Sequence, residues 1–168
     1  MTEADDRAAM IATTADGARP TGSSDAQHPR LPDYPTLAEM EAFFRRDTFA
    51  YDRAGCRIVE GWIGHGVCEM EITAGHLNAE GHVMGGAIFT LADYAFAVAT
   101  MCGASASVSL SSTIEFMTSS RGTKLIATAD VDKPGRRVGF YTIEVRDDQG
   151  AHIAKVVTTC YHPRSQQA

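Results

Sequence analysis

A chain of 168 residues is long enough for one ordinary domain and short for two. Hydrophobic residues make up 44% and charged residues 21%, a balance that argues against a disordered, collagen-like or membrane-embedded chain. The net charge of −6 gives no sign of the basic face that nucleic-acid-binding proteins carry, so nucleic acid is not expected as a partner.

The first 35 residues hold four of the six prolines and no apolar periodicity, so residues 1–35 are predicted to be a disordered or loosely attached arm. No basic segment followed by an apolar core indicates a secretory signal, and the four cysteines form no CxxC pair. We therefore expect a cytoplasmic chain without a metal site. The segment TLAEMEAFFRRD predicts a short helix capped by Thr36, with Leu37, Met40 and Phe44 on its buried stripe.

Six short runs with strand character follow Gly55. CRIVEGWI and VCEMEIT, joined by GHG, predict two strands; SVSLSSTIEFM, TKLIATADV, VGFYTIEV and HIAKVVTTCYH predict four more. The last four are expected to be antiparallel, because their connections are too short for crossovers. In the first of them, strict alternation places Ser109 and Ser111 on one face, which would be rich in hydroxyls.

Between the second and third runs lies HVMGGAIFTLADYAFAVATMC, in which the only charged residue after His82 is Asp93. A central carboxylate is costly in a bilayer and no Lys or Arg flanks the segment, so we do not expect it to cross a membrane. The run predicts instead a long helix beginning near Gly85 and enclosed by the curled sheet. Residues 36–164 would form this single α+β domain, and residues 165–168 a tail.

The glycine pair Gly85–Gly86 would let another group approach the unpaired N–H groups of the first helical turn, which can stabilise an oxyanion. Asp93 follows eight residues after Gly85, about 12 Å along the axis, so one helix cannot present both groups to one carbonyl. If they cooperate, two subunits must share each site. The simpler alternatives are that the glycines form a sharp turn and that Asp93 is a buried carboxylate satisfied by Ser or backbone donors.

The segment HLNAEGHVMGGAIFTLADYAFAVA resembles the helix-start motif of the hotdog-fold acyl-CoA thioesterases, specifically the PaaI-like group associated with phenylacetate degradation. Its pattern is approximately N-x-x-G-x-x-H-G-G followed by an Asp, and the matching residues are Asn78, Gly81, Gly85, Gly86, Leu91 and Asp93. The likeness extends from about residue 37 to residue 162. It implies a hotdog fold, in which an antiparallel sheet of five to six strands wraps around one long central helix.

The resemblance also implies roles for single residues. Asp93 would be the catalytic carboxylate, acting as a nucleophile or as a base on water. The Gly86 N–H, together with that of Gly85, would polarise the thioester carbonyl from the neighbouring subunit. Asn78 would position the carbonyl or the water, and Ser109 would orient the nucleophile or water.

At one position the sequence departs from the family pattern, because Met84 stands where the family usually has His. Methionine cannot donate the hydrogen bond that histidine can. His82, two residues earlier, is a candidate replacement. Arg136 and Arg137, in a turn between strands, are candidates to bind the phosphates of CoA. The expected partners are an acyl-CoA substrate and further copies of the chain, in a homodimer or homotetramer, and no cofactor is implied.

Three functions remain open from the sequence. The leading one is hydrolysis of an aryl- or medium-chain acyl-CoA thioester. The second is a hotdog hydratase or dehydratase that would use His76 with Asp93, although the D-x-N-P-x-H motif is absent. The third is a catalytically weak CoA-ester-binding protein, which the presence of Met84 keeps in consideration.

Overall fold

The structure, a computed structural model, describes residues 30–103 and 107–163. Most of the predicted arm and the whole predicted tail therefore lie outside the described residues. The elements are α2 (Leu37–Phe44), the π-helical turn η1 (Phe49–Arg53), β1 (Arg57–Trp62), β2 (His65–Glu71), the short 3-10 turn η2 (Ala74–His76), α3 (Gly85–Met101), β3 (Val108–Phe116), β4 (Lys124–Lys133), β5 (Val138–Asp147) and β6 (His152–Tyr161).

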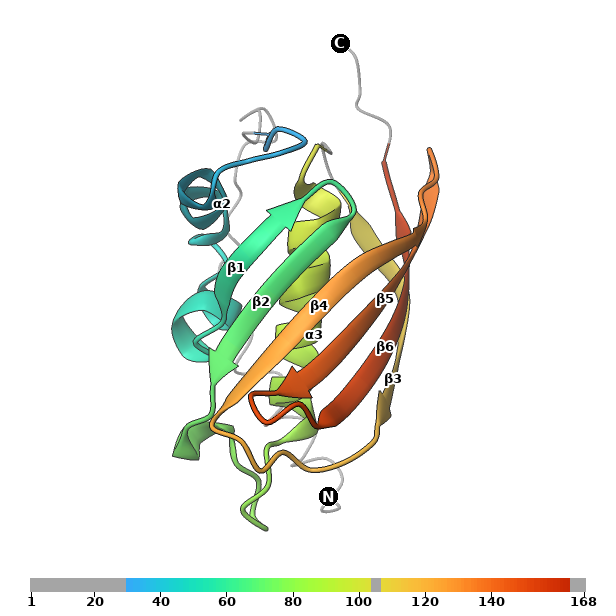
Figure 1. The fold of residues 1–168 in the computed structure, drawn as a ribbon. Helices are drawn as coiled ribbons and strands as arrows, with labels where there is room; N and C mark the ends of the chain where they lie inside the picture. The colour runs from blue at the N-terminus through green and yellow to red at the C-terminus, as the bar shows by residue number, and fades with distance from the viewer. Residues whose placement is uncertain (1–29, 104–106, 164–168) are drawn as a thin grey trace, which may run out of the picture.

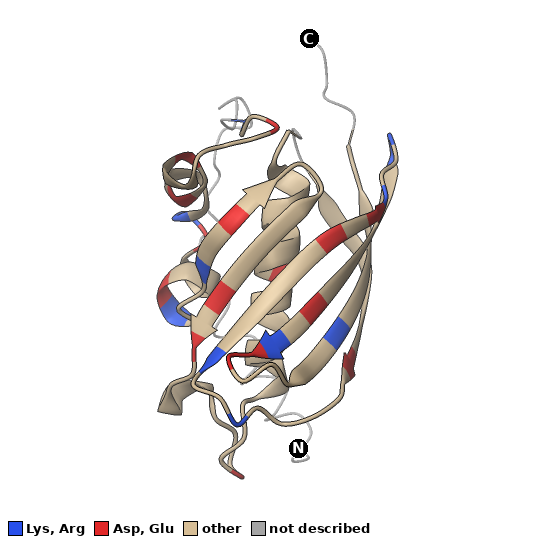
Figure 2. Cartoon of the chain, in the orientation of Figure 1, with Lys and Arg blue, Asp and Glu red and all other residues tan. Residues whose placement is uncertain are grey.

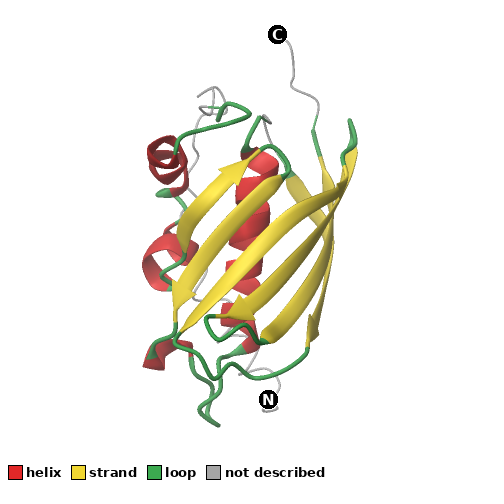
Figure 3. Ribbon diagram, in the orientation of Figure 1, coloured by secondary structure: helices red, strands yellow, loops and turns green. Residues whose placement is uncertain are grey.

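The strands form one sheet of six in the order β1-β2-β4-β5-β6-β3, and every neighbouring pair is antiparallel. Figure 1 and Figure 3 show this sheet curving around α3, which lies against its inner face. The predicted strands and the predicted central helix are thereby confirmed. Because β3 pairs with β6, it ends up at one edge of the sheet, although it follows the helix in the sequence.

The apolar sequence of α3 is explained by its packing, chiefly on β2 and β4. Leu91, Ala95 and Val98 are fully buried there. A glycine in β2 permits the close approach, because an ideal Cβ on Gly66 would lie 2.5 Å from the Ala95 carbonyl oxygen. Within residues 30–103 and 107–163, no helix combines the length and the hydropathy that a membrane crossing needs.

The helix α2 packs beside β1 and begins with a capping box. The Thr36 hydroxyl accepts the Glu39 N–H, and the Glu39 carboxylate accepts the Thr36 N–H at 2.7 Å. Met40 and Phe44 are buried as predicted, but Leu37 is 44% exposed, so its assignment to the buried stripe is wrong.

The packed part of the chain begins before residue 36, the predicted start of the domain. Leu31 is buried and forms an isolated parallel bridge with Cys102 at the end of α3. The Gly103 N–H donates to the Leu31 carbonyl at 3.2 Å. The end of the predicted arm is therefore part of the core.

Charged residues occur along several strands of the sheet, at the blue and red positions of Figure 2. Lys124 on β4, for example, lies 3.0 Å from Glu69 and 3.1 Å from Glu71, both on β2. The apolar residues of the same strands point toward α3, so the two faces of the sheet differ sharply in character.

Candidate active site at the start of the central helix

The first turn of α3 offers N–H groups without partners. Met84 is the N-cap and provides no side-chain cap. Its carbonyl accepts the N–H groups of Ala87 at 2.9 Å and Ile88 at 3.2 Å, while the N–H groups of Gly85 and Gly86 make no hydrogen bond among the described residues. These two amides lie at the positive end of the helix dipole and can bind an oxygen that carries negative charge.

The two glycines meet different surroundings. An ideal Cβ on Gly85 would lie 2.9 Å from Cζ of Phe116, so this glycine is needed to accommodate that ring. At Gly86 the only neighbour within 4 Å would be Cε of Met84, at 3.8 Å. Packing within the chain therefore explains Gly85 but not Gly86, whose exposed side is open to a ligand or to another chain.

The loop before α3 is organised by Asn78. The Asn78 side-chain oxygen accepts the Glu80 N–H at 3.0 Å and the His82 N–H at 3.1 Å, and the Asn78 N–H donates to the His82 carbonyl at 2.8 Å. These bonds form a tight turn that leads the chain into the helix. The side-chain oxygen of Asn78 is thus used locally, and only its amide nitrogen lacks a partner among the described residues.

A cavity of about 400 Å³ opens at this end of the molecule. Its lining residues come from the loop, from the first turns of α3 and from the segment after β3: Asn78, His82, Val83, Gly85, Ile88, Phe116, Met117, Thr118, Ser119 and Ser120. Three predicted site residues, Asn78, His82 and Gly85, therefore line the cavity beside apolar side chains. The backbone N–H of Gly85 has no partner among the described residues. An acyl group with its carbonyl at the helix start fits this combination of surfaces.

Asp93 lies on the one face of α3 that the sheet leaves uncovered. Gly86, Thr90, Asp93 and Ala97 follow one another at helical spacing, and all four are exposed or half-buried. The expected enclosure of α3 is therefore incomplete along this stripe. Asp93 is exposed and makes no hydrogen bond among the described residues, so the described part of the chain supplies none of the Ser or backbone donors that the alternative of a satisfied buried carboxylate needs.

The pKa of the Asp93 carboxyl is raised from its usual value of 3.8, first by burial and then by the negative charge of Asp47. Although the side chain reaches solvent, the protein atoms around it remove enough water to disfavour the charged form. A carboxylate with a raised pKa is a stronger base, which suits a group that must take a proton from water.

A bulge in β3 changes the predicted pattern of its serines. Ser109 lies opposite Cys160 and Ser111 lies opposite Thr159, so one extra residue separates them. Opposite residues in an antiparallel pair point to the same side, and Cys160 is fully buried while Thr159 is not. Ser109 and Ser111 therefore point to opposite sides, and their predicted common face is wrong. Ser109 points to the side of the sheet on which α3 packs.

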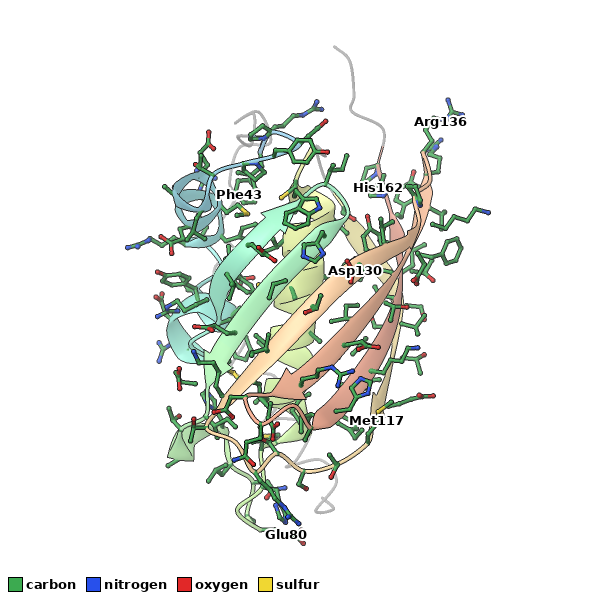
Figure 4. All side chains as sticks on the ribbon, viewed as in Figure 1. Phe43, Glu80, Met117, Asp130, Arg136 and His162 are labelled. Atoms are coloured by element: carbon green, nitrogen blue, oxygen red, sulfur yellow. The ribbon has the colours of Figure 1, made fainter. Side chains whose placement is uncertain are left out.

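The lining of the cavity does not include the other predicted site residues: Met84, Gly86, Asp93, Ser109, Arg136 and Arg137. Met84 is 57% exposed next to Gly86. Arg136 and Arg137 lie in the turn between β4 and β5, and Arg137 donates to the hydroxyl of Tyr161, the last residue of β6, at 2.7 Å. Figure 4 shows Arg136 at the opposite end of the molecule from Glu80, which belongs to the loop before α3. The two arginines thus lie at the other end of the sheet from the cavity of their own chain.

The segment between β3 and β4 contributes four lining residues that no motif in the sequence marks as part of a site. Met117, Thr118, Ser119 and Ser120 line the cavity, and Arg121 follows them directly. Arg121 was recognisable as a turn cation, but nothing in the sequence places its turn at the same end as the start of α3. Among the described residues, no group of His, Cys, Asp and Glu has a geometry that could hold a metal ion.

Comparison with known proteins identifies the family. The family model of the thioesterase superfamily matches residues 80–154. A putative esterase of Archaeoglobus fulgidus is 32% identical over 126 residues, which cover 74% of this chain and 82% of the relative. The acyl-coenzyme A thioesterase PaaI of Escherichia coli is 38% identical over 92 residues, which cover 54% of this chain and 66% of that protein.

Solved structures agree. The Escherichia coli PaaI protein of the phenylacetic acid degradation operon superposes with a TM-score of 0.69 at 29% identity, covering 77% of this chain and 95% of that one. Zebrafish thioesterase superfamily member 2 gives a TM-score of 0.67 at 28% identity, covering 76% and 99%. This chain has six antiparallel strands around one helix, and together with these neighbours that architecture confirms the hotdog fold and the PaaI-like resemblance. The chain belongs to the thioesterase superfamily.

Proposed function

We propose that this chain hydrolyses the thioester of an aryl- or medium-chain acyl-CoA to a carboxylic acid and free CoA. The observation that carries the proposal is the exposed stripe of α3, which joins Gly86, whose N–H has no partner among the described residues, to the carboxylate of Asp93. The family and the acyl-CoA thioesterase activity named for the Escherichia coli relative support a thioester as the substrate.

In the proposed reaction, an oxygen adds to the thioester carbonyl carbon, the C–S bond breaks, and the CoA thiolate takes up a proton. The N–H of Gly86, with that of Gly85, stabilises the negative charge that develops on the carbonyl oxygen. Asp93 acts in one of two ways. It removes a proton from the attacking water, or it attacks the carbonyl carbon itself and forms an anhydride that water then cleaves.

The spacing of these groups supports a homodimer with two shared sites. A homotetramer, which is common in the resembled group, would contain two such dimers. Gly85 and Asp93 are separated by about 12 Å along one helix, so the amides of one chain must meet the Asp93 of another. Within residues 30–103 and 107–163, the edge strand β3 pairs only with β6, and it exposes Val108 and Leu110. Such an edge is suited to pairing with a second copy.

The other candidate residues have supporting roles in this proposal. Asn78 shapes the loop and offers its free amide nitrogen to the carbonyl or to water. Ser109 faces the side of the sheet that carries α3 and orients the nucleophile or water. Arg136 and Arg137 bind the phosphates of a CoA whose acyl group lies in the neighbouring chain's cavity. Arg121 binds the phosphates of a CoA at the cavity of its own chain. A cytoplasmic location stays a prediction, with which the four buried free cysteines are compatible.

A second candidate function is a CoA-ester-binding protein with weak activity. It is favoured by Met84, the exposed N-cap of α3, which stands where a histidine is usual in the resembled group. The hydratase alternative has less support, because the His76 ring nitrogen Nδ1 accepts the Thr73 N–H at 3.1 Å and His76 has no described contact with Asp93.

The test is a panel of aryl- and medium-chain acyl-CoA substrates with thiol release measured on the wild type and on Asp93→Asn. We expect release in the wild type and a fall of about a hundredfold or more in the variant, the scale of losing a catalytic base. Asp52→Asn, an exposed carboxylate on η1, is the matched control and should retain full activity. Tight binding without thiol release would establish the binding protein, and substrate loss without thiol release would establish the hydratase.

A further inference from the structure

The segment of residues 117–123, between β3 and β4, forms one wall of the cavity. Residues 117–120 face the cavity across from Asn78 and Ile88. Both ends of the segment are tied to neighbouring elements: the Met117 N–H donates to the Ile153 carbonyl at 2.9 Å, and the Thr123 carbonyl accepts the Ile72 N–H at 2.7 Å. These two backbone hydrogen bonds do not hold the middle of the segment.

Asp147, at the end of β5, provides that support. This carboxylate is only 2% exposed. Its Oδ2 accepts three hydrogen bonds from the middle of the wall: the Ser120 hydroxyl at 3.1 Å, the Arg121 N–H at 3.2 Å and the Gly122 N–H at 3.2 Å. Ser120 is both a lining residue of the cavity and a direct partner of Asp147.

The other carboxylate oxygen holds the turn between β5 and β6. Oδ1 of Asp147 accepts the Gln149 N–H at 3.1 Å and the Ala151 N–H at 2.9 Å. One buried side chain therefore joins the cavity wall to the sheet through five hydrogen bonds. Burial alone would raise the pKa of Asp147, but the hydrogen bonds from Ala151, Arg121, Ser120 and Gln149 outweigh it and hold the pKa below its usual 3.8. The group is a carboxylate at neutral pH.

We propose that Asp147 is a positioning residue of the site, because it fixes the wall formed by residues 117–122 in the shape that receives the substrate. The proposal rests on the proposed function for its kinetic consequence. It does not depend on that function for the order of the wall itself. Asp147 touches no reacting atom, so its effect falls on substrate binding rather than on the chemical step.

The variant Asp147→Asn keeps the size of the side chain and breaks this arrangement. An amide has one accepting oxygen and one donating nitrogen. Whichever way it turns, its NH2 group faces two backbone N–H donors: those of Arg121 and Gly122 on the wall side, beside the Ser120 hydroxyl, or those of Gln149 and Ala151 on the turn side. The variant therefore loses hydrogen bonds either to the cavity wall or to the turn between β5 and β6. Glu144→Gln is the matched control, because the carboxylate of Glu144 pairs with Arg146 and His152 and makes no hydrogen bond or ion pair with residues 117–123 in the described part of the chain.

Two readouts are made on protein shown to be folded by circular dichroism. Trypsin cleavage after Arg121 reports the order of the wall; we expect it to be roughly tenfold faster in Asp147→Asn than in the wild type, since hydrogen bonds to a charged group are lost. For acyl-CoA hydrolysis we expect KM to rise about tenfold with kcat changed less than about twofold. Glu144→Gln should match the wild type in both measurements.

Wild-type cleavage and wild-type KM in a folded Asp147→Asn protein would overturn the proposal. If this variant does not fold, Ser120→Ala replaces it: this change removes one donor to Asp147 and one acceptor of the Gly122 N–H, and it should shift both readouts in the same direction by a smaller factor. No shift would again overturn the proposal. If the wild type hydrolyses no thioester, the proposed function fails, while trypsin cleavage and calorimetric binding of coenzyme A still decide the role of Asp147.

Discussion

Replacing Gly86 by alanine should lower kcat/KM without lowering the free energy of unfolding. An ideal Cβ at this position would contact only Cε of Met84, at the ordinary distance of 3.8 Å. Alanine stabilises a helix relative to glycine by about 0.5–1 kcal/mol, so Gly86→Ala should leave the free energy of unfolding unchanged or raise it by up to about 1 kcal/mol. The added methyl group would nevertheless stand beside the N–H that we assign to the carbonyl oxygen.

We therefore expect kcat/KM of Gly86→Ala to fall by about a hundredfold, the scale of losing one oxyanion donor. Gly85→Ala is the comparison, because its Cβ would lie 2.9 Å from Cζ of Phe116 and must displace a ring. That displacement should cost about 1–3 kcal/mol, offset in part by the gain in helix propensity. Urea unfolding measures the stabilities and thiol release measures the activities. Wild-type kcat/KM in Gly86→Ala would refute the reasoning.

Two further predictions concern titration. Since the folded state raises the pKa of Asp93, it binds more protons than the unfolded state above pH 3.8, and stability is lost as pH rises through the folded pKa. Asp93→Asn should therefore raise Tm most at neutral pH and progressively less toward pH 4, as differential scanning calorimetry can show; an equal effect at both pH values would contradict the assigned cause. Burial raises the pKa of Cys56 to about 12 and that of Cys102 to about 11. An aromatic disulfide reagent should thus react far more slowly with the native chain than with the unfolded chain, in which all four thiols respond, and rapid native reaction would argue against the packing.

Much of the fold follows from the sequence because its signals are local. The alternation in VCEMEIT is seen in β2, where Cys68 and Met70 are fully buried and Glu71 is exposed. The paired glycines after Met84 mark where the helix begins, because they follow a loop whose turn is formed by Asn78. Period and turn chemistry are properties of a few neighbouring residues, so they can be read from one chain.

The corrected features depend on contacts between distant segments. The bulge that separates Ser109 from Ser111 is defined by the pairing of β3 with β6, and the run SVSLSST carries no sign of it. Leu31 enters the core only because the end of α3 lies beside it. Asp147 belongs to DDQG, a typical turn sequence, and its burial under the cavity wall arises only when the loop between β3 and β4 comes to rest on it.

The open stripe of α3 has a consequence for the free chain. Under the proposed mechanism each protomer contributes to two separate reaction centres. It supplies the Asp93 carboxylate to one centre and the N–H groups of Gly85 and Gly86 to the other. A dissociated protomer would then be correctly folded yet unable to turn over substrate, and specific activity would fall on dilution without any loss of secondary structure. Such an enzyme is regulated by its own concentration.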